Sequence, residues 1–221
     1  MRIPEADEGA RALTGDFLSF WFEPWRELHP SWIEGDPDAA QWLQGVVRGG
    51  AAQRFAYRLF CHRFDVDMGL PHSEVRRIAD LPLDRGSVEG AALFVGMVSQ
   101  ASREDAASFW LVHGASLMTL EGVVAWREAH RFARARPLRA GASAPSGPMT
   151  RQTLTVQGLL VMRAALGLIG TGLWSRLRLR CDRSLVDLSE NAGRGVASPP
   201  DAMTLRQVLR AWQRSKSMAF G

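Results

Sequence analysis

Apolar residues in this chain recur mostly at the three- and four-residue spacing of an α-helix. Two such faces are clearest. One belongs to a helix that Ser87 begins and consists of Ala91, Phe94, Val95 and Val98. The other belongs to a last helix that follows two prolines and consists of Leu205, Val208, Leu209 and Trp212. This spacing places one side of each helix against a common core. The pattern therefore predicts a mainly α, irregular multi-helix fold.

Glycines and capping residues divide the rest of the helical pattern. The spacing across residues 37–64 is interrupted at Gly49-Gly50, which predicts two helices rather than one. A short helix is expected after Ser73. A longer helix is expected to begin at Ser102, where the sequence resembles a capping box, and to end near Arg136.

Small and polar residues fill two stretches between the predicted helices. Residues 137–150 are rich in glycine, proline and serine, which predicts a flexible loop, and residues 189–200 are expected to form another. The segment behind the first loop is too small to be an independent unit. We therefore expect a single domain over residues 1–221.

Two segments depart from the helical spacing. Residues 17–33 are crowded with aromatic side chains and broken by Pro24 and Pro30, so short pieces are expected whose rings are buried against the body or a partner. Residues 176–181 alternate arginine with an apolar residue, which is the period of a half-buried strand. Because a lone strand needs a partner, a short strand pair stays an open alternative here.

The composition indicates a folded, cytoplasmic protein. The chain has 221 residues, 46% of them hydrophobic and eight of them tryptophan, which supports a substantial core. Cys61 and Cys181 are too few for a disulfide scaffold, and the first residues do not resemble a secretory signal. The apolar run 154–174 contains Arg163, which would cost roughly 2.5–3.5 kcal/mol at bilayer depth. A core helix is expected there, not a membrane span.

Positive charge comes almost entirely from arginine, and the formal net charge is +4. The densest basic segment comprises Arg127, Arg131, Arg134, Arg136 and Arg139. Arginine forms forked hydrogen bonds with carboxylates and phosphates, so an acidic partner is plausible. No helix-turn-helix or base-stacking platform is visible, and nucleic-acid binding is not expected.

No pattern in the chain predicts catalytic, metal or nucleotide chemistry. The ligand types His62, Asp65, Asp67 and His72 follow no metal-site spacing, and Cys61 beside His62 would point away from it on a helix. The glycines of residues 167–172 lack the lysine of a phosphate-binding loop, and close helix packing explains them better. His113 lies on an apolar stripe, which favours a core or boundary role. We expect no enzyme activity, cofactor, metal or small-molecule substrate.

Two segments resemble a known family. Residues 20–33, FWFEPWRELHPSWI, are similar to the opening of the SctK family of bacterial type III secretion accessory proteins, which has the form F-x-P-x-x-Y-L-H-P-S-W-L. Residues 173–180, LWSRLRLR, resemble the tryptophan and arginine-leucine alternation that follows an apolar stretch near the end of that family. The two matches cover under a quarter of the chain, in the same order and spacing.

The resemblance implies a non-enzymatic adaptor of the cytoplasmic sorting platform, peripheral to the inner membrane through its protein complex. Its implied partners are the cytoplasmic domain of the inner-membrane ring and the cytoplasmic-ring pod protein. Residues hypothesised to lie at or beneath partner surfaces are Trp25, Leu28, His29, Trp32, Arg176, Arg178 and Arg180. Two alternatives stay open: a basic helical protein that binds nucleic acid or an acidic surface, and an enzyme whose site is assembled from distant residues.

Overall fold

The computed structural model describes residues 15–47, 53–69, 84–103, 120–138, 149–192 and 199–220, and within these ranges every regular element is helical. The α-helices are α1 (Gly15–Phe22), α2 (Pro37–Val47), α3 (Gln53–Arg63), α4 (Arg85–Ala101), α6 (Leu120–Ala135), α7 (Arg151–Gly167), α8 (Thr171–Leu177), α9 (Arg183–Asn191) and α10 (Ala202–Phe220). Two 3-10 turns are η1 (Pro30–Trp32) and η4 (Arg178–Arg180). The mainly α prediction is confirmed.

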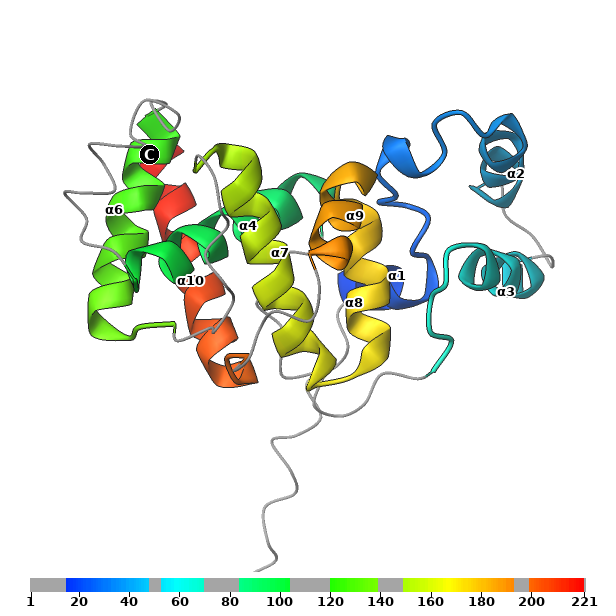
Figure 1. The fold of residues 1–221 in the computed structure, drawn as a ribbon. Coiled ribbons are helices and arrows are strands. Elements are labelled where there is room, and N and C mark those ends of the chain that lie inside the picture. Colours follow the sequence, from blue (N-terminus) through cyan, green and yellow to red (C-terminus); the bar gives the residue numbers. More distant parts are fainter. Residues whose placement is uncertain are drawn as a thin grey trace, which may run out of the picture.

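The helices are arranged in a row (Figure 1). The green α6 and the red α10 form one end, α4 crosses behind α7 in the middle, and the blue α2 and cyan α3 form the other end. The predicted break between two helices in residues 37–64 is confirmed, since α2 ends at Val47 and α3 begins at Gln53.

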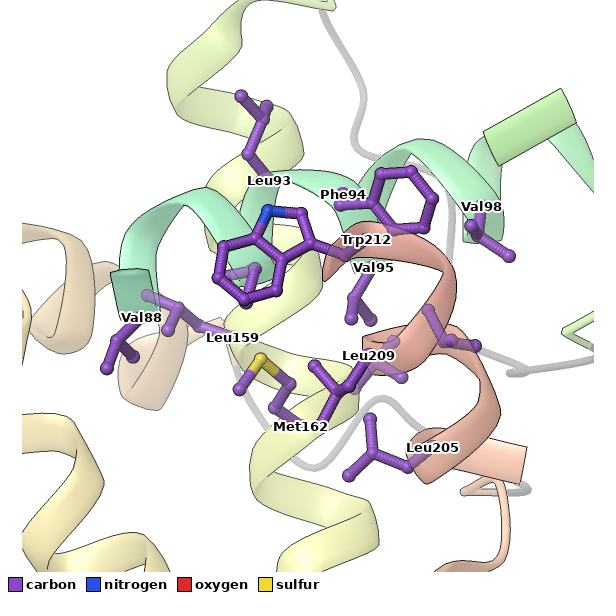
Figure 2. Close-up of a cluster of buried hydrophobic side chains, with 14 of the residues drawn as sticks. Val88, Leu93, Phe94, Val95, Val98, Leu159, Met162, Leu205, Leu209 and Trp212 are labelled. Carbon is purple, nitrogen blue, oxygen red and sulfur yellow. The ribbon is translucent and has the colours of Figure 1, made fainter. Parts of the chain in front are cut away.

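The larger hydrophobic cluster lies where α4 crosses α7 and α10 (Figure 2). Both faces predicted from the sequence are buried in it: Ala91, Phe94, Val95 and Val98 from α4, and Leu205, Val208, Leu209 and Trp212 from α10. From α7 come Leu159 and Met162, which are fully buried. Burial of side chains of this size contributes roughly 1.5–3 kcal/mol each, so the cluster holds the row together.

Two glycines allow α4 and α7 to approach closely. A Cβ on Gly96 of α4 would overlap the backbone carbonyl of Leu154, and a Cβ on Gly158 of α7 would overlap the carbonyl of Ala92. Beside this crossing the Gln157 amide donates to the Ser99 hydroxyl at 3.1 Å. The backbones therefore touch without side chains between them.

A smaller hydrophobic cluster joins α3 to the segment that follows α1 in sequence. It consists of Trp25, Leu28, Phe60, Cys61, Phe64, Val66 and Leu179. Aromatic rings make most of it: Phe60 and Phe64 lie 4.7 Å apart between centroids, and Trp25 meets Phe60 edge-on at 5.8 Å. The α3 end of the row is thus held by the aromatic segment that the sequence marks as unusual.

Several sequence predictions are corrected. Residues 176–181 contain no strand, because α8 runs to Leu177 and η4 follows it. The alternating pattern was misleading because even- and odd-numbered residues are both buried here, including Arg176 and Arg180. The predicted loop at residues 189–200 begins later, since α9 ends at Asn191.

Further predictions meet the structure only in part. The apolar run 154–174 forms two helices divided by a turn at residues 168–170. Ser102 caps the C-terminus of α4: its hydroxyl donates to the Val98 carbonyl at 2.7 Å and accepts from the Leu138 N–H at 3.0 Å. The helix after Ser73, the capping-box partner of Ser102, His113 and residues 139–148 of the predicted loop lie outside the described residues.

No helix in the described ranges is long and apolar enough to cross a membrane.

Candidate functional site: the aromatic–arginine junction

The two segments that carry the family resemblance pack against each other. The Trp32 indole N–H donates to the Cys181 carbonyl at 3.0 Å, and the His29 backbone N–H donates to the Leu179 carbonyl at 2.8 Å. The Ser31 hydroxyl accepts from the Arg183 N–H at 2.8 Å. Segments about 150 residues apart in sequence therefore share one site. We call it the aromatic–arginine junction: Phe20, Trp21, Trp25, Leu28, His29 and Trp32 with Arg176, Arg178 and Arg180.

His29 and Ser31 owe their positions to η1. The ring Nδ1 of His29 lies 2.7 Å from the Ser31 hydroxyl and accepts from the Ser31 N–H, which caps this short turn. Proline at the first position of η1 presets the backbone for it. The His-Pro-Ser-Trp sequence thus builds a turn that aims Trp32 at η4.

Arg176 is the buried centre of the junction, with 1% of its surface exposed. Its guanidinium lies 4.0 Å from the centroid of the Trp21 ring and donates to the Trp21 carbonyl at 3.0 Å, to the Gly172 carbonyl at 2.8 Å and to the Tyr57 hydroxyl at 2.7 Å. A Cβ on Gly172 would lie 3.0 Å from the Arg176 Nη1 atom. This glycine supports the close-packing prediction for residues 167–172, whereas a Cβ on Gly167 would meet nothing within 4 Å.

Arg178 links the junction to α3 and α9. Its guanidinium donates to the Phe64 carbonyl at 2.8 Å, lies 3.4 Å from the Glu190 carboxylate and sits 5.6 Å from the centroid of the Trp32 ring. Arg183 faces the same ring at 5.6 Å. The indole of Trp32 is therefore flanked by two cations, an arrangement that aromatic rings favour.

Arg180 is also buried, with 3% of its surface exposed, and its guanidinium lies 4.7 Å from the centroid of the Phe20 ring. Loss of hydration lowers the pKa of Arg180 to about 10, although the nearby carboxylates of Glu27 and Asp84 oppose this shift. The Glu27 carboxylate also accepts from the Arg85 N–H at 3.2 Å, at the start of α4.

The exposure of the hypothesised partner-binding residues divides them into two groups. Trp25, Leu28, Arg176 and Arg180 are buried within the chain, whereas His29, Trp32 and Arg178 are half-buried. The first group can act only beneath a partner surface. The second group reaches solvent and can touch a partner directly.

An exposed apolar surface on α3, made by Phe55 and Leu59, was not expected from the sequence. Phe55 is 67% and Leu59 42% exposed on α3, and Phe22 is 41% exposed on α1. Phe22 lies apart from these two residues: its ring lies 6.3 Å from that of Tyr57, which faces the opposite side of α3 and bonds to Arg176. The signal was present in α3, where two apolar stripes, Phe55 with Leu59 and Ala56 with Phe60, lie side by side although one suffices for burial.

Two ionisable groups of α3 lie beside the junction. Burial raises the pKa of the Tyr57 phenol and of the Cys61 thiol, while Arg176 opposes both shifts. Both groups are therefore neutral at pH 7, so neither is activated as a nucleophile.

The candidate metal residues form no cluster in the described part of the chain. There, no group of three histidine, cysteine, aspartate or glutamate side chains could hold a metal ion, and His72 lies outside it. Asp65 instead adopts a left-handed backbone, with φ of 49°, just after α3. That conformation is typical of a residue that ends a helix.

Comparisons with known proteins assign no family to the chain. No family model, curated protein or solved structure matches it. The junction is thus the structural feature on which a functional proposal must rest.

Proposed function

We propose that this protein is a non-enzymatic adaptor of the cytoplasmic sorting platform in a bacterial type III secretion system. In that role it bridges the cytoplasmic domain of the inner-membrane ring to the pod protein and works beside the membrane without spanning it. One observation carries the proposal: the two segments that resemble the SctK family, residues 20–33 and 173–180, form one packed junction. A chance resemblance in two places gives no reason for such contact.

The chemistry of the junction supports binding rather than catalysis. Its arginines are held by ring faces and backbone carbonyls, and the neighbouring Cys61 thiol and Tyr57 phenol are neutral at pH 7. Arginine and tryptophan are enriched at the energetic centres of protein interfaces. The half-buried Trp32 and Arg178 are the members of the junction best placed for that use.

The exposed apolar surface beside the junction supplies a contact area. Contiguous exposed apolar side chains mark interaction sites, because leaving them in water is unfavourable. Phe55 and Leu59, one helical turn apart on α3, provide such side chains. We assign this surface to one of the two platform partners.

Binding of each purified partner to this protein tests the proposal. The variant Phe55→Ser with Leu59→Ser removes the apolar surface of α3, and we expect at least tenfold weaker binding of one partner. The matched control is Leu168→Ser with Leu188→Ser, which alters two apolar residues of similar exposure elsewhere (67% and 47%) and should bind as the wild type does. Circular dichroism verifies folding. If neither partner binds the wild type, the proposal fails.

A further inference from the structure

The two ends of the row carry opposite charge. Residues 15–47 and 53–69, which include α1, α2 and α3, contain eight acidic residues and four arginines. Residues 120–138 and 199–220, which include α6 and α10, contain eight basic residues and three acidic ones. These two helices pack together at the opposite end from α2 and α3 (Figure 1). The net charge of +4 therefore conceals a strongly basic end.

A shallow crevice of about 40 Å³ opens at this basic end. It lies where α4, α6 and α10 meet the first residue of α7, and its walls include Arg151, Lys216 and the indole of Trp212. None of the described residues that line it is acidic. A single water needs roughly 10–15 Å³ of such space, so the crevice is large enough for a carboxylate.

Contacts within the chain hold the cation of Lys216 at the crevice. Its ammonium lies 5.6 Å from the centroid of the Trp212 ring and 3.4 Å from the Ser87 hydroxyl. Arg151 is the first residue of α7, directly after the capping box of Thr150 and Thr153, so its backbone is fixed as well. Two basic residues thus line one small space.

We propose that the α6–α10 end docks an acidic segment of a partner protein, and that one of its carboxylates enters the crevice between Arg151 and Lys216. This inference rests on the proposed adaptor role and adds a second docking surface, at the end opposite the exposed apolar residues of α3. An adaptor with one apolar and one basic surface can hold two chemically different partners at once. Like charge at the basic end also rejects a basic partner.

The surface of α6 and α10 favours a protein over nucleic acid or lipid. Trp126 and Trp212 are buried, so neither offers a ring on which a base could stack. The helices also lack the row of exposed large apolar residues with which a membrane-surface helix inserts, since only Val123 and Met203 of their described side chains are of that kind. Glu128 lies among the α6 arginines and pairs with Arg131 at 2.8 Å, so this row already accepts a carboxylate.

A single-lysine experiment tests the proposal. Lys216 is the one lysine in the sequence, so reductive methylation with ¹³C formaldehyde labels one side-chain amine besides the terminal amine. Titration with a short glutamate-rich peptide should shift the Lys216 methyl signal in NMR spectra, and the shift should weaken as salt is raised. Arg151→Gln should weaken the peptide about threefold, the scale of one exposed ion pair.

The matched control is Arg54→Gln with Arg58→Gln, which removes exposed arginines from α3 at the other end and should leave the titration unchanged. An unmoved Lys216 signal, or equal affinity of the Arg151 variant, overturns the proposal. So does tighter binding of duplex DNA or of phosphatidylglycerol vesicles than of the peptide. The assay contains no secretion protein, so it is independent of the proposed function. Peptide binding without binding of the platform proteins would refute the proposed function alone. Binding of the platform proteins without peptide binding would refute this inference alone.

Discussion

The close crossing of α4 and α7 predicts that a glycine-to-alanine substitution within a helix destabilises the protein, which is the opposite of the usual effect. In the interior of a helix, glycine to alanine normally stabilises a protein by roughly 0.5–1 kcal/mol, because alanine restricts the unfolded chain. At Gly96 the added Cβ would overlap the Leu154 carbonyl of the facing helix. Backbone cannot rotate away as a side chain can, so α4 and α7 must separate.

The expected cost exceeds the gain in propensity. Overpacking a core costs roughly 1–3 kcal/mol, and the larger value applies where the obstacle is backbone. We therefore expect Gly96→Ala to lower the free energy of unfolding by about 2 kcal/mol. For a chain of this size that corresponds to a midpoint of thermal unfolding roughly 4–8 °C lower.

Gly90→Ala is a control in the same helix. A Cβ there would meet Trp212 at an ordinary 3.6 Å, so this variant should gain roughly 0.5–1 kcal/mol. Urea unfolding followed by circular dichroism at 222 nm, a routine helix band, measures both. If Gly96→Ala proves as stable as the wild type or more so, the helices do not cross as described.

Three further predictions concern the junction and the helix ends. Trp32→Phe keeps the ring but removes the donor to the Cys181 carbonyl, and should cost about 1 kcal/mol of unfolding free energy in urea titrations; no loss would mean that this hydrogen bond is absent in solution. Burial raises the pKa of the Cys181 thiol far above its usual 9, so the thiol ionises first in the unfolded chain and stability should fall as pH rises above about 9. Cys181→Ala should make this fall less steep. An unchanged slope would show that the buried thiol does not cause it. Asp201 accepts from the Thr204 N–H, which lowers its pKa, so this contribution is present above pH 3.8 and lost below it. Asp201→Ala should therefore cost about 1 kcal/mol at pH 7 and much less at pH 3, and an equal cost at both would rule out a charged cap.

The helical faces could be predicted because each depends on local spacing. In α10 the residues at three- and four-residue intervals form one buried face, whereas in α4 the predicted residues are only part of a helix that is buried on nearly every side. The division into α2 and α3 was likewise predicted from neighbouring residues, Gly49 and Gly50. These features depend only on neighbours in sequence.

The strand that the alternation of residues 176–181 left open shows where local patterns mislead. A half-buried strand would expose its arginines, yet Arg176 and Arg180 are buried under the rings of Trp21 and Phe20. A guanidinium stacks on aromatic rings and bonds to carbonyls, so it can occupy a core position. Those rings lie about 150 residues away in sequence, and no local rule could pair them.

The contacts of the junction could be predicted only in part. The resemblance identified both segments but not their contact. The sequence left open whether Trp25 and Leu28 are buried within the chain or lie at a partner surface. The exposed Phe55 and Leu59 were not singled out, since an apolar residue on a helix is ordinarily assigned to the core. The crevice at Lys216 forms where four helices meet, so no pattern within a single helix could predict it.

Bridging is the central claim, and a three-protein assembly tests it most directly. The cytoplasmic domain of the inner-membrane ring, the pod protein and this protein would be mixed and analysed by size-exclusion chromatography with light scattering. The account predicts that the two partners co-migrate only when this protein is present, and that Phe55→Ser with Leu59→Ser releases one of them. Co-migration without this protein, or its elution apart from both partners, would contradict the account.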